Sequence, residues 1–345
     1  MNRTRLMYFA SAFLVLGPHH VHAIVTSDAR GTHVVPPGTI TFGLNLDGVA
    51  RVEIGYPAID EILRTGSGAL ISDRHVITAA HLFDLPPDGQ LDSFPFEEFL
   101  RFSATFEAAG GPATLTFSKT SVRIMPNWPD TFADLAIVEL DQPAPAGVPR
   151  YPLYGVGDEL GQPTVIVGYG ATGHGATGVN DESTIKRAGL NRFEAFGEEI
   201  DLGRADRIPP GSALVIDFDS GLARNNTLQE HFLIPSDLGF GADEVSTARG
   251  DSGGPAFIGG AIAGITATGF SSFPTDVTPG VPFDSAWGSL NFQTRISSFQ
   301  DFIETATDGQ AVFVPEPSTA TLFTAATILA LLCRALCRAN FGGNK

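Results

Sequence analysis

The chain has 345 residues, of which 43% are hydrophobic, and this is enough to bury a sizeable core. Its 38 acidic residues outnumber its 21 basic residues, which gives a net charge of −17 at pH 7. A surface this negative repels the phosphates of nucleic acids and of anionic lipids, so we expect neither as a partner.

Residues 1–23 have the pattern of a signal peptide. Two arginines precede an apolar run from Leu6 to Leu16, and Val21-His22-Ala23 forms a small-residue cleavage site. A run of about eleven apolar residues is too short to span a bilayer. We therefore expect export and cleavage by signal peptidase, which leaves a single domain over residues 24–312.

The middle of the chain has the pattern of an all-β protein. Short apolar or β-branched runs alternate with turns rich in Gly, Pro and Asp, as in Greek-key β-barrels. We expect strands over Val49–Ile54, Ala69–Thr78, Ala113–Phe117, Leu135–Leu140, Thr164–Tyr169, Ala213–Phe218 and Ala261–Thr268. One helix is expected, over Ser297–Thr307, with Phe299, Phe302 and Ile303 on one face and Ser297 or Ser298 as its N-cap.

Three segments carry residues suited to nucleophilic catalysis. Ser252 lies in Gly250-Asp251-Ser252-Gly253-Gly254-Pro255, where backbone amides can hold an oxyanion. A serine hydroxyl needs a base and an orienting acid. His81 ends the run Val76-Ile77-Thr78-Ala79-Ala80-His81, and Asp134 opens the alternating run 133–140.

These segments resemble the catalytic blocks of the trypsin/chymotrypsin-like serine proteases, in that family's order of His, Asp and Ser. The similarity extends from Gly66 to Ile303, with scattered matches over 173–244. It implies two Greek-key β-barrels, over 40–145 and 155–295, and a closing helix. His81 and Asp134 would lie on the first barrel and Ser252 on the second.

The resemblance implies a secreted or surface-associated serine endopeptidase that cleaves proteins or peptides as a monomer without a cofactor. His81 would be the base, Asp134 its orienting acid, and the amides of Gly250 and Ser252 the oxyanion hole. One alternative is a non-catalytic trypsin-fold binding or matrix protein displayed at the cell surface. An ester-selective hydrolase is another.

Several residues compete with these assignments. His75 lies within a strand-like run and is expected to be structural, while Asp130 and Asp141 lie in a turn and beyond a strand. Arg249-Gly250-Asp251 spells an adhesion tripeptide, but the resemblance implies that Asp251 points inward. The run 217–221 contains two aspartates suggestive of calcium, yet it lacks the rest of an EF-hand loop. We expect a solvated acidic turn there and assign no metal ligand.

Specificity is implied by residues near the serine. Ser246 would lie at the base of the P1 pocket, with Thr247 beside it, and Ala267-Thr268-Gly269 would form a wall. An uncharged Ser246 argues against Lys or Arg at P1. An apolar or aromatic P1 is our preferred expectation, and a polar or acidic P1 is the alternative.

The resemblance also implies an activation mechanism. In the family a new N-terminus, usually Ile-Val, places its ammonium beside the aspartate that precedes the serine. Here Ile24-Val25 follows the expected cleavage site directly, so Ile24 would pair with Asp251. The alternative is that Ile24-Val25 is simply the first strand of the mature chain.

The tail, residues 313–345, resembles a PEP-CTERM sorting signal of Gram-negative bacteria. Pro315-Glu316-Pro317 precedes an apolar stretch over 320–336 and a basic end with Arg338. Such a tail would enter the inner membrane transiently before an exosortase-like enzyme removes it, and a permanent membrane anchor is the alternative. Both cysteines, Cys333 and Cys337, lie in the tail, so we expect no disulfide in the catalytic domain.

Overall fold

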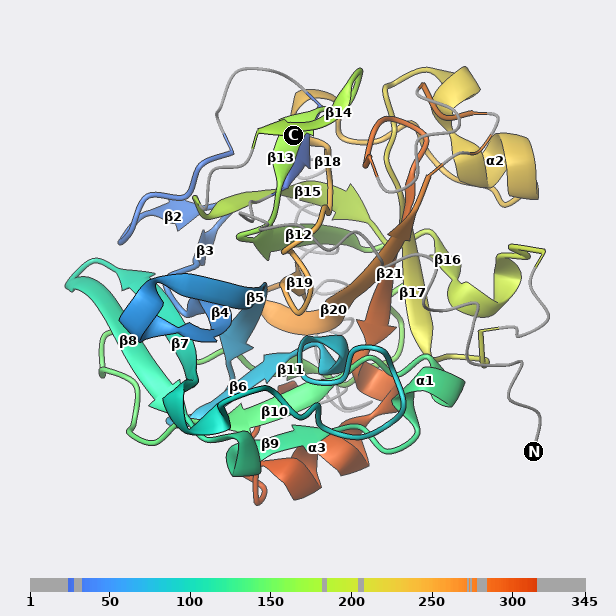
Figure 1. Ribbon diagram of the computed structural model, residues 1–345. Helices are drawn as coiled ribbons and strands as arrows, with labels where there is room; N and C mark the ends of the chain where they lie inside the picture. The colour runs from blue at the N-terminus through green and yellow to red at the C-terminus, as the bar shows by residue number, and fades with distance from the viewer. Residues whose placement is uncertain are drawn as a thin grey trace, which may run out of the picture.

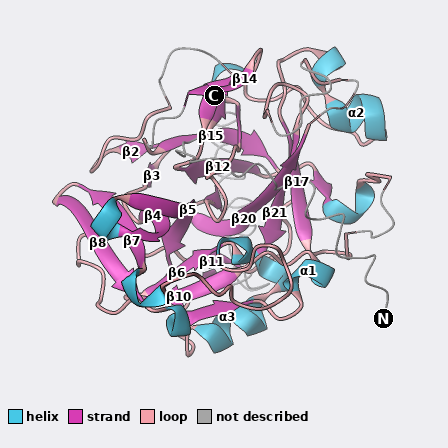
Figure 2. Ribbon diagram, in the orientation of Figure 1, coloured by secondary structure: helices cyan, strands magenta, loops and turns pink. Residues whose placement is uncertain are grey.

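The computed structural model describes residues 24–27, 33–181, 185–203, 208–271, 273, 275–277 and 284–314. The expected signal peptide and the PEP-CTERM motif lie outside these residues. Two curled β-sheets contain most of the strands, and the short helices lie at the periphery (Figures 1 and 2). The expected all-β fold with a helix near its end is confirmed.

The first sheet contains seven strands in the order β8-β7-β4-β5-β6-β10-β9, and all neighbouring strands are antiparallel. In chain order the strands are β4 (Val49–Tyr56), β5 (Glu61–Leu70), β6 (His75–Thr78), β7 (Arg101–Ala108), β8 (Gly111–Phe117), β9 (Val122–Ile124) and β10 (Ala136–Glu139).

The single strand expected over Ala69–Thr78 is wrong, because the chain turns back between β5 and β6. Ser72 Oγ accepts the backbone N–H groups of Arg74 and His75 at 3.2 and 3.0 Å. This use of a serine side chain stabilises a tight turn and competes with extended structure.

The second sheet follows the order β15-β12-β19-β20-β21-β17-β16, with β11 pairing β20 and β22 beside it. Its strands are β11 (Leu153–Tyr154), β12 (Pro163–Gly168), β15 (Arg187–Arg192), β16 (Ala195–Phe196), β17 (Ala213–Asp217), β19 (Pro255–Ile258), β20 (Ala261–Phe270), β21 (Leu290–Arg295) and β22 (Phe313–Val314).

Two smaller sheets contain the remaining strands of the described residues. In the larger of them, β1 (Val25–Thr26) lies between β13 (Thr172–His174), to which it is parallel, and β18 (Val245–Ser246), to which it is antiparallel. β14 (Gly178–Asp181) pairs with β13, and β2 (Ile40–Thr41) pairs with β3 (Leu44–Asn45).

The helices are short: α1 (Trp128–Thr131), α2 (Thr227–Phe232) and α3 (Gln300–Ala306). The expectation of one helix missed both α1 and α2. The N-cap of α2, Asn226, accepts the N–H of Gln229 at 2.8 Å. The expected serine cap of α3 is also wrong, since its N-cap is Phe299. Ser298 Oγ instead donates to the Gly211 carbonyl at 2.6 Å. Within the described ranges, no helix has the length and apolar character needed to cross a membrane.

One hydrophobic cluster joins the two large sheets. It includes Val49 and Ile77 from the first sheet and Val167, Phe257 and Ile265 from the second, all at most 1% exposed. Close-packed burial of this kind fixes the relative position of the sheets, and therefore of the loops that each sheet carries.

Candidate active site

His81 and Asp134 are brought together by strand pairing. His81 lies in a 3-10 turn over Ala80–Leu82 that follows β6, and Asp134 lies just before β10. The antiparallel register places Ala136 opposite Thr78, so the two flanking segments meet.

The Asp134 carboxylate holds both the ring and the backbone of His81. Oδ2 lies 2.6 Å from His81 Nδ1, and Oδ1 accepts the His81 backbone N–H at 2.9 Å. The two residues are 6% and 8% exposed, so this interaction is largely shielded from water. A carboxylate at Nδ1 favours the tautomer that carries its proton there, which leaves Nε2 able to accept a proton.

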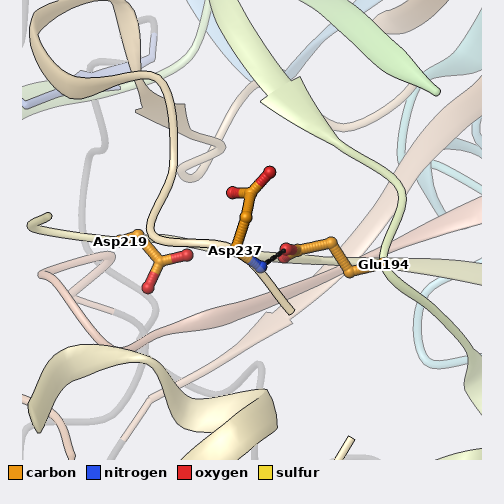
Figure 3. Close-up of side chains that lie close together, drawn as sticks. All are labelled: Glu194, Asp219 and Asp237. Atoms are coloured by element: carbon orange, nitrogen blue, oxygen red, sulfur yellow. Dashed lines mark hydrogen bonds between the residues drawn. The ribbon is translucent and has the colours of Figure 1, made fainter. Parts of the chain in front are cut away.

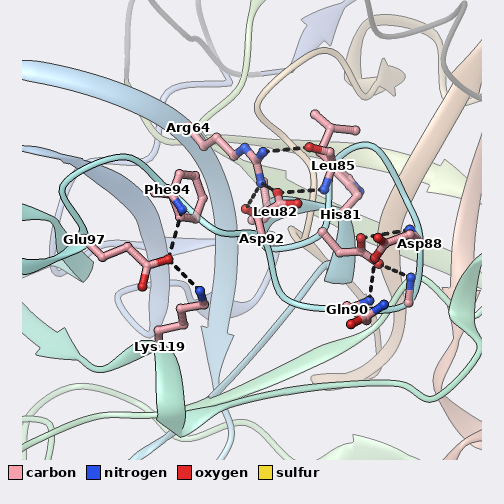
Figure 4. Close-up of polar contacts among 12 residues, drawn as sticks. Arg64, His81, Leu82, Leu85, Asp88, Gln90, Asp92, Phe94, Glu97 and Lys119 are labelled. Carbon is pink, nitrogen blue, oxygen red and sulfur yellow. Dashed lines mark hydrogen bonds and ion pairs between the residues drawn. The ribbon is translucent and has the colours of Figure 1, made fainter.

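The chain after His81 is held by an arginine that sequence analysis did not identify. Arg64, on β5, donates to the carbonyls of Leu82 and Leu85 at 3.0 and 3.1 Å and forms an ion pair with Asp92 at 2.6 Å (Figure 4). Three interactions from one guanidinium fix the end of the turn that carries the imidazole and the chain that follows it. Arg64 is therefore a positioning residue for His81.

The loop that carries Ser252 packs against the segment that leads to His81. Ser252 is partly exposed, and its carbonyl accepts the backbone N–H of Ser67 at 2.7 Å. At Gly253, where φ is 81°, an added Cβ would collide with Thr78 Oγ1 and lie 2.8 Å from the Ala79 nitrogen. The glycine permits this approach, so residues from both sheets converge at the candidate site.

The candidate oxyanion hole is arranged by two carbonyl contacts. The Arg249 carbonyl accepts the N–H of Ala171 at 2.7 Å, and the C=O and N–H of a trans peptide point in opposite directions. The N–H of Gly250 therefore points away from Ala171. The carbonyl of Gly250, where φ is 91°, accepts Ser67 Oγ at 3.0 Å.

Within the described ranges, neither candidate oxyanion amide is used internally. Among the hydrogen bonds of the described residues, none is donated by the backbone N–H of Gly250 or of Ser252. Backbone donors that are fixed in place and unused can bind a negatively charged oxygen without reorganisation. Ser67, which sequence analysis also missed, donates from its hydroxyl to the Gly250 carbonyl and from its backbone N–H to the Ser252 carbonyl.

Asp251 lies behind this loop and is completely buried. Its carboxylate accepts backbone N–H groups from Ile24 at 3.0 Å and from Gly170 and Ala248 at 2.8 Å each. Burial raises the pKa of Asp251 to about 7, and the three amide donors oppose that rise. Ile24 is itself buried, and its carbonyl accepts Thr172 Oγ1 at 2.6 Å.

The expected specificity residues form a neutral polar group. Ser246 Oγ accepts Asn291 Nδ2 at 2.8 Å, and Thr247 Oγ1 donates to Asn291 Oδ1. Ala267, Thr268 and Gly269 all lie on β20. Gly269 pairs directly with Asn291 on the neighbouring strand β21. Asn291 is thus the additional residue of this group, which sequence analysis could not place.

The competing residues lie elsewhere. His75 is buried in β6 with Nδ1 2.8 Å from Ser72 Oγ, while Asp130 and Asp141 are exposed. The expectation of a solvated acidic turn over 217–221 is wrong, because both of its aspartates are buried. Asp217 ends β17 with no exposed surface, and Asp219 is 1% exposed.

Comparison with known proteins gives one family match and a structural match. Residues 50–189 match the family model for trypsin, a range that contains His81 and Asp134 and ends before Ser252. No curated protein matches the chain significantly. The structure is similar to that of neuropsin, a serine protease expressed in the limbic system of mouse brain, with a TM-score of 0.51 and 16% sequence identity over 75% of this chain and 94% of that one. The fold is therefore trypsin-like, and the family match covers part of the chain.

Proposed function

We propose that the chain is a serine endopeptidase that uses His81, Asp134 and Ser252. The observation that carries this proposal is the buried 2.6 Å contact between Asp134 and His81 Nδ1, on a segment against which the serine loop packs. In the first step Ser252 gives its proton to His81 Nε2 while Oγ attacks the peptide carbonyl carbon. The amides of Gly250 and Ser252 would bind the resulting oxyanion.

The remaining steps conserve atoms and protons. The tetrahedral intermediate collapses, the C–N bond breaks, and the leaving amine takes the proton from His81. Water then attacks the acyl-enzyme and gives its proton to His81, and the acid product leaves as Ser252 recovers its proton.

A fluorophosphonate probe tests this proposal. Labelling of the wild-type chain with no labelling of Ser252→Ala would support it, whereas an unlabelled wild type would favour a non-catalytic binding protein. Parallel assays with peptide and ester libraries distinguish a peptidase from an ester-selective hydrolase. His81→Ala and the double variant with Ser252→Ala should lose nearly the same activity as Ser252→Ala alone, because the pair acts as a unit.

We also propose that the P1 side chain is uncharged, with apolar or aromatic residues preferred. This is supported by the neutral group of Ser246, Thr247 and Asn291, which offers no carboxylate to a lysine or arginine. The peptide library tests it directly: a cleavage profile dominated by basic P1 residues would refute it.

Cleavage before Ile24 is proposed as the activating event. The Ile24 nitrogen lies 3.0 Å from Asp251 Oδ2, where a new ammonium would pair with the buried carboxylate. Ile24 also has φ of 44°, which is unfavourable for a β-branched residue. Cleavage removes the peptide bond that defines this angle, so it would relieve the strain as it creates the charge.

For localisation we propose export by signal peptidase followed by sorting of the tail to the cell surface of a Gram-negative bacterium. The support is the sequence pattern at each end, which lies outside the described residues. Fractionation of the native host with an antibody against the catalytic domain tests the proposal, and detection in the cytoplasm alone would refute it.

A further inference from the structure

Three carboxylates from loops that adjoin the second sheet lie together, and none of them belongs to the candidate active site. Glu194 lies between β15 and β16, Asp219 follows β17, and Asp237 lies between α2 and β18. One oxygen from each lies within 4.8 Å of the others. Figure 3 shows the Asp219 carboxylate facing the other two residues, and the Asp237 N–H donates to Glu194 Oε1 at 3.0 Å.

Asp219 is the residue whose surroundings indicate a bound ligand. It is 1% exposed, and neither of its carboxylate oxygens has a hydrogen-bond partner among the described residues. Native proteins rarely leave a buried polar atom unpaired, because the lost hydration is not replaced. A buried carboxylate aimed at two others without a donor is therefore best explained by a bound cation.

The charges around Asp219 strengthen this argument. Asp217 and Glu244 are also buried, and each lies close enough to Asp219 to interact with it electrostatically. Arg192 Nε forms an ion pair with Asp237 Oδ2 at 2.7 Å. No basic side chain in the described ranges forms an ion pair with Glu194 or Asp219. The local negative charge is thus only partly compensated by protein groups.

We propose that Glu194, Asp219 and Asp237 bind a calcium ion. The ligands are all oxygens, which suits a hard cation and not a transition metal that prefers nitrogen or sulfur. Calcium binds oxygen at about 2.3–2.6 Å, so two of its ligands can lie up to about 5 Å apart, whereas magnesium ligands must lie closer together. The upper bound of 4.8 Å between the three oxygens lies within the range that calcium allows. Asp237 is exposed, which gives the ion a route from solvent.

The bound ion would join three segments that are distant in sequence. It would attach the loop containing Asp237 to the ends of β15 and β17, and that loop leads into β18 and Ser246. Calcium would therefore stabilise the approach to the proposed specificity residues, although the site is independent of the proposed catalytic chemistry.

The test uses the full chain carrying Ser252→Ala, so that self-digestion cannot be mistaken for instability. Chelator-treated protein is titrated with CaCl2 by calorimetry, and its Tm is measured with and without about 5 mM CaCl2. We expect one site with a Kd of about 10⁻⁵ to 10⁻³ M and a rise in Tm of about 5 °C. Asp219→Asn should weaken binding at least about tenfold, because it removes one charged ligand.

Two comparisons make the result specific. Asp243→Asn removes the same charge from an exposed neighbouring position and should leave the Kd within about twofold. Glu194→Gln tests a second ligand if Asp219→Asn folds poorly by circular dichroism. An absence of heat and of a Tm shift with calcium would overturn the proposal. So would equal stabilisation by MgCl2, or unchanged affinity in both ligand variants.

Discussion

The proposed pairing of Ile24 with Asp251 gives a pH-dependent prediction. The perturbation is one extra Met before Ile24 in a protein that otherwise begins there, both in the Ser252→Ala background. The extension replaces an ammonium with a neutral amide while it keeps the 3.0 Å contact to Asp251 Oδ2. The two proteins then have the same net charge, but only the shorter one places its ammonium directly beside the Asp251 carboxylate, which has no exposed surface.

The magnitude follows from the pKa of Asp251. With an amide at Ile24, burial raises this pKa from 3.8 to about 7. Between these values the folded state binds a proton that the unfolded state has released, so stability falls as pH rises from about 4 to about 7 and then levels off. At 1.36 kcal/mol per pKa unit the loss is about 4 kcal/mol. An ammonium at Ile24 stabilises the carboxylate and should remove most of that loss.

Urea unfolding from pH 4.5 to 8 measures the effect, with retention of the Met verified by mass. The stability difference between the two proteins should grow toward pH 7, and the change Asp251→Asn should abolish its pH dependence. A difference that is constant with pH would refute the reasoning. The same two proteins are also compared with Ser252 intact. Equal peptidase activity with and without the extra Met would refute activation by the pair of Ile24 and Asp251.

Three further predictions concern the site and the tail. Asp134→Asn should lower kcat about 10³ to 10⁴-fold at unchanged stability, because the amide favours the wrong His81 tautomer. Steady-state kinetics measure this effect, and a loss below about tenfold would contradict the prediction. Gly253→Ala should destabilise by more than about 2 kcal/mol in urea, since its Cβ collides with Thr78, while Gly259→Ala, with open space around it, should cost about 1 kcal/mol. Intact-mass measurement of native protein should find no apolar tail beyond about Ser318, and a retained tail would favour the permanent anchor.

His81, Asp134 and Ser252 were predicted from short motifs that resemble the catalytic blocks of the trypsin-like family. The runs beside His81 and Asp134 also have the apolar pattern of strands, which is visible without knowledge of the tertiary structure. The strands β4, β8, β10, β12, β17 and β20 were expected within a few residues for the same reason. The turn between β5 and β6 was missed because Ser72 supplies its stabilising contacts from within a strand-like run.

Supporting residues could not be predicted, because their partners are distant in sequence. Ser67 reaches Gly250 across 183 positions, and no local pattern marks that contact. Lys186 is a stronger example, since a lysine is ordinarily exposed. Its ammonium is buried, donates to the Leu46 carbonyl at 3.0 Å and lies over the Tyr169 ring, and burial lowers its pKa to about 8.

The hydrophobic cluster shared by Val49, Ile77, Val167, Phe257 and Ile265 has a consequence for cooperativity. Because both sheets contribute to it, neither can lose its packing without exposing apolar surface on the other. We expect the two sheets to unfold in one transition, as a single folding unit. The candidate base and nucleophile would then appear together late in folding, which would keep partly folded chains from cleaving one another.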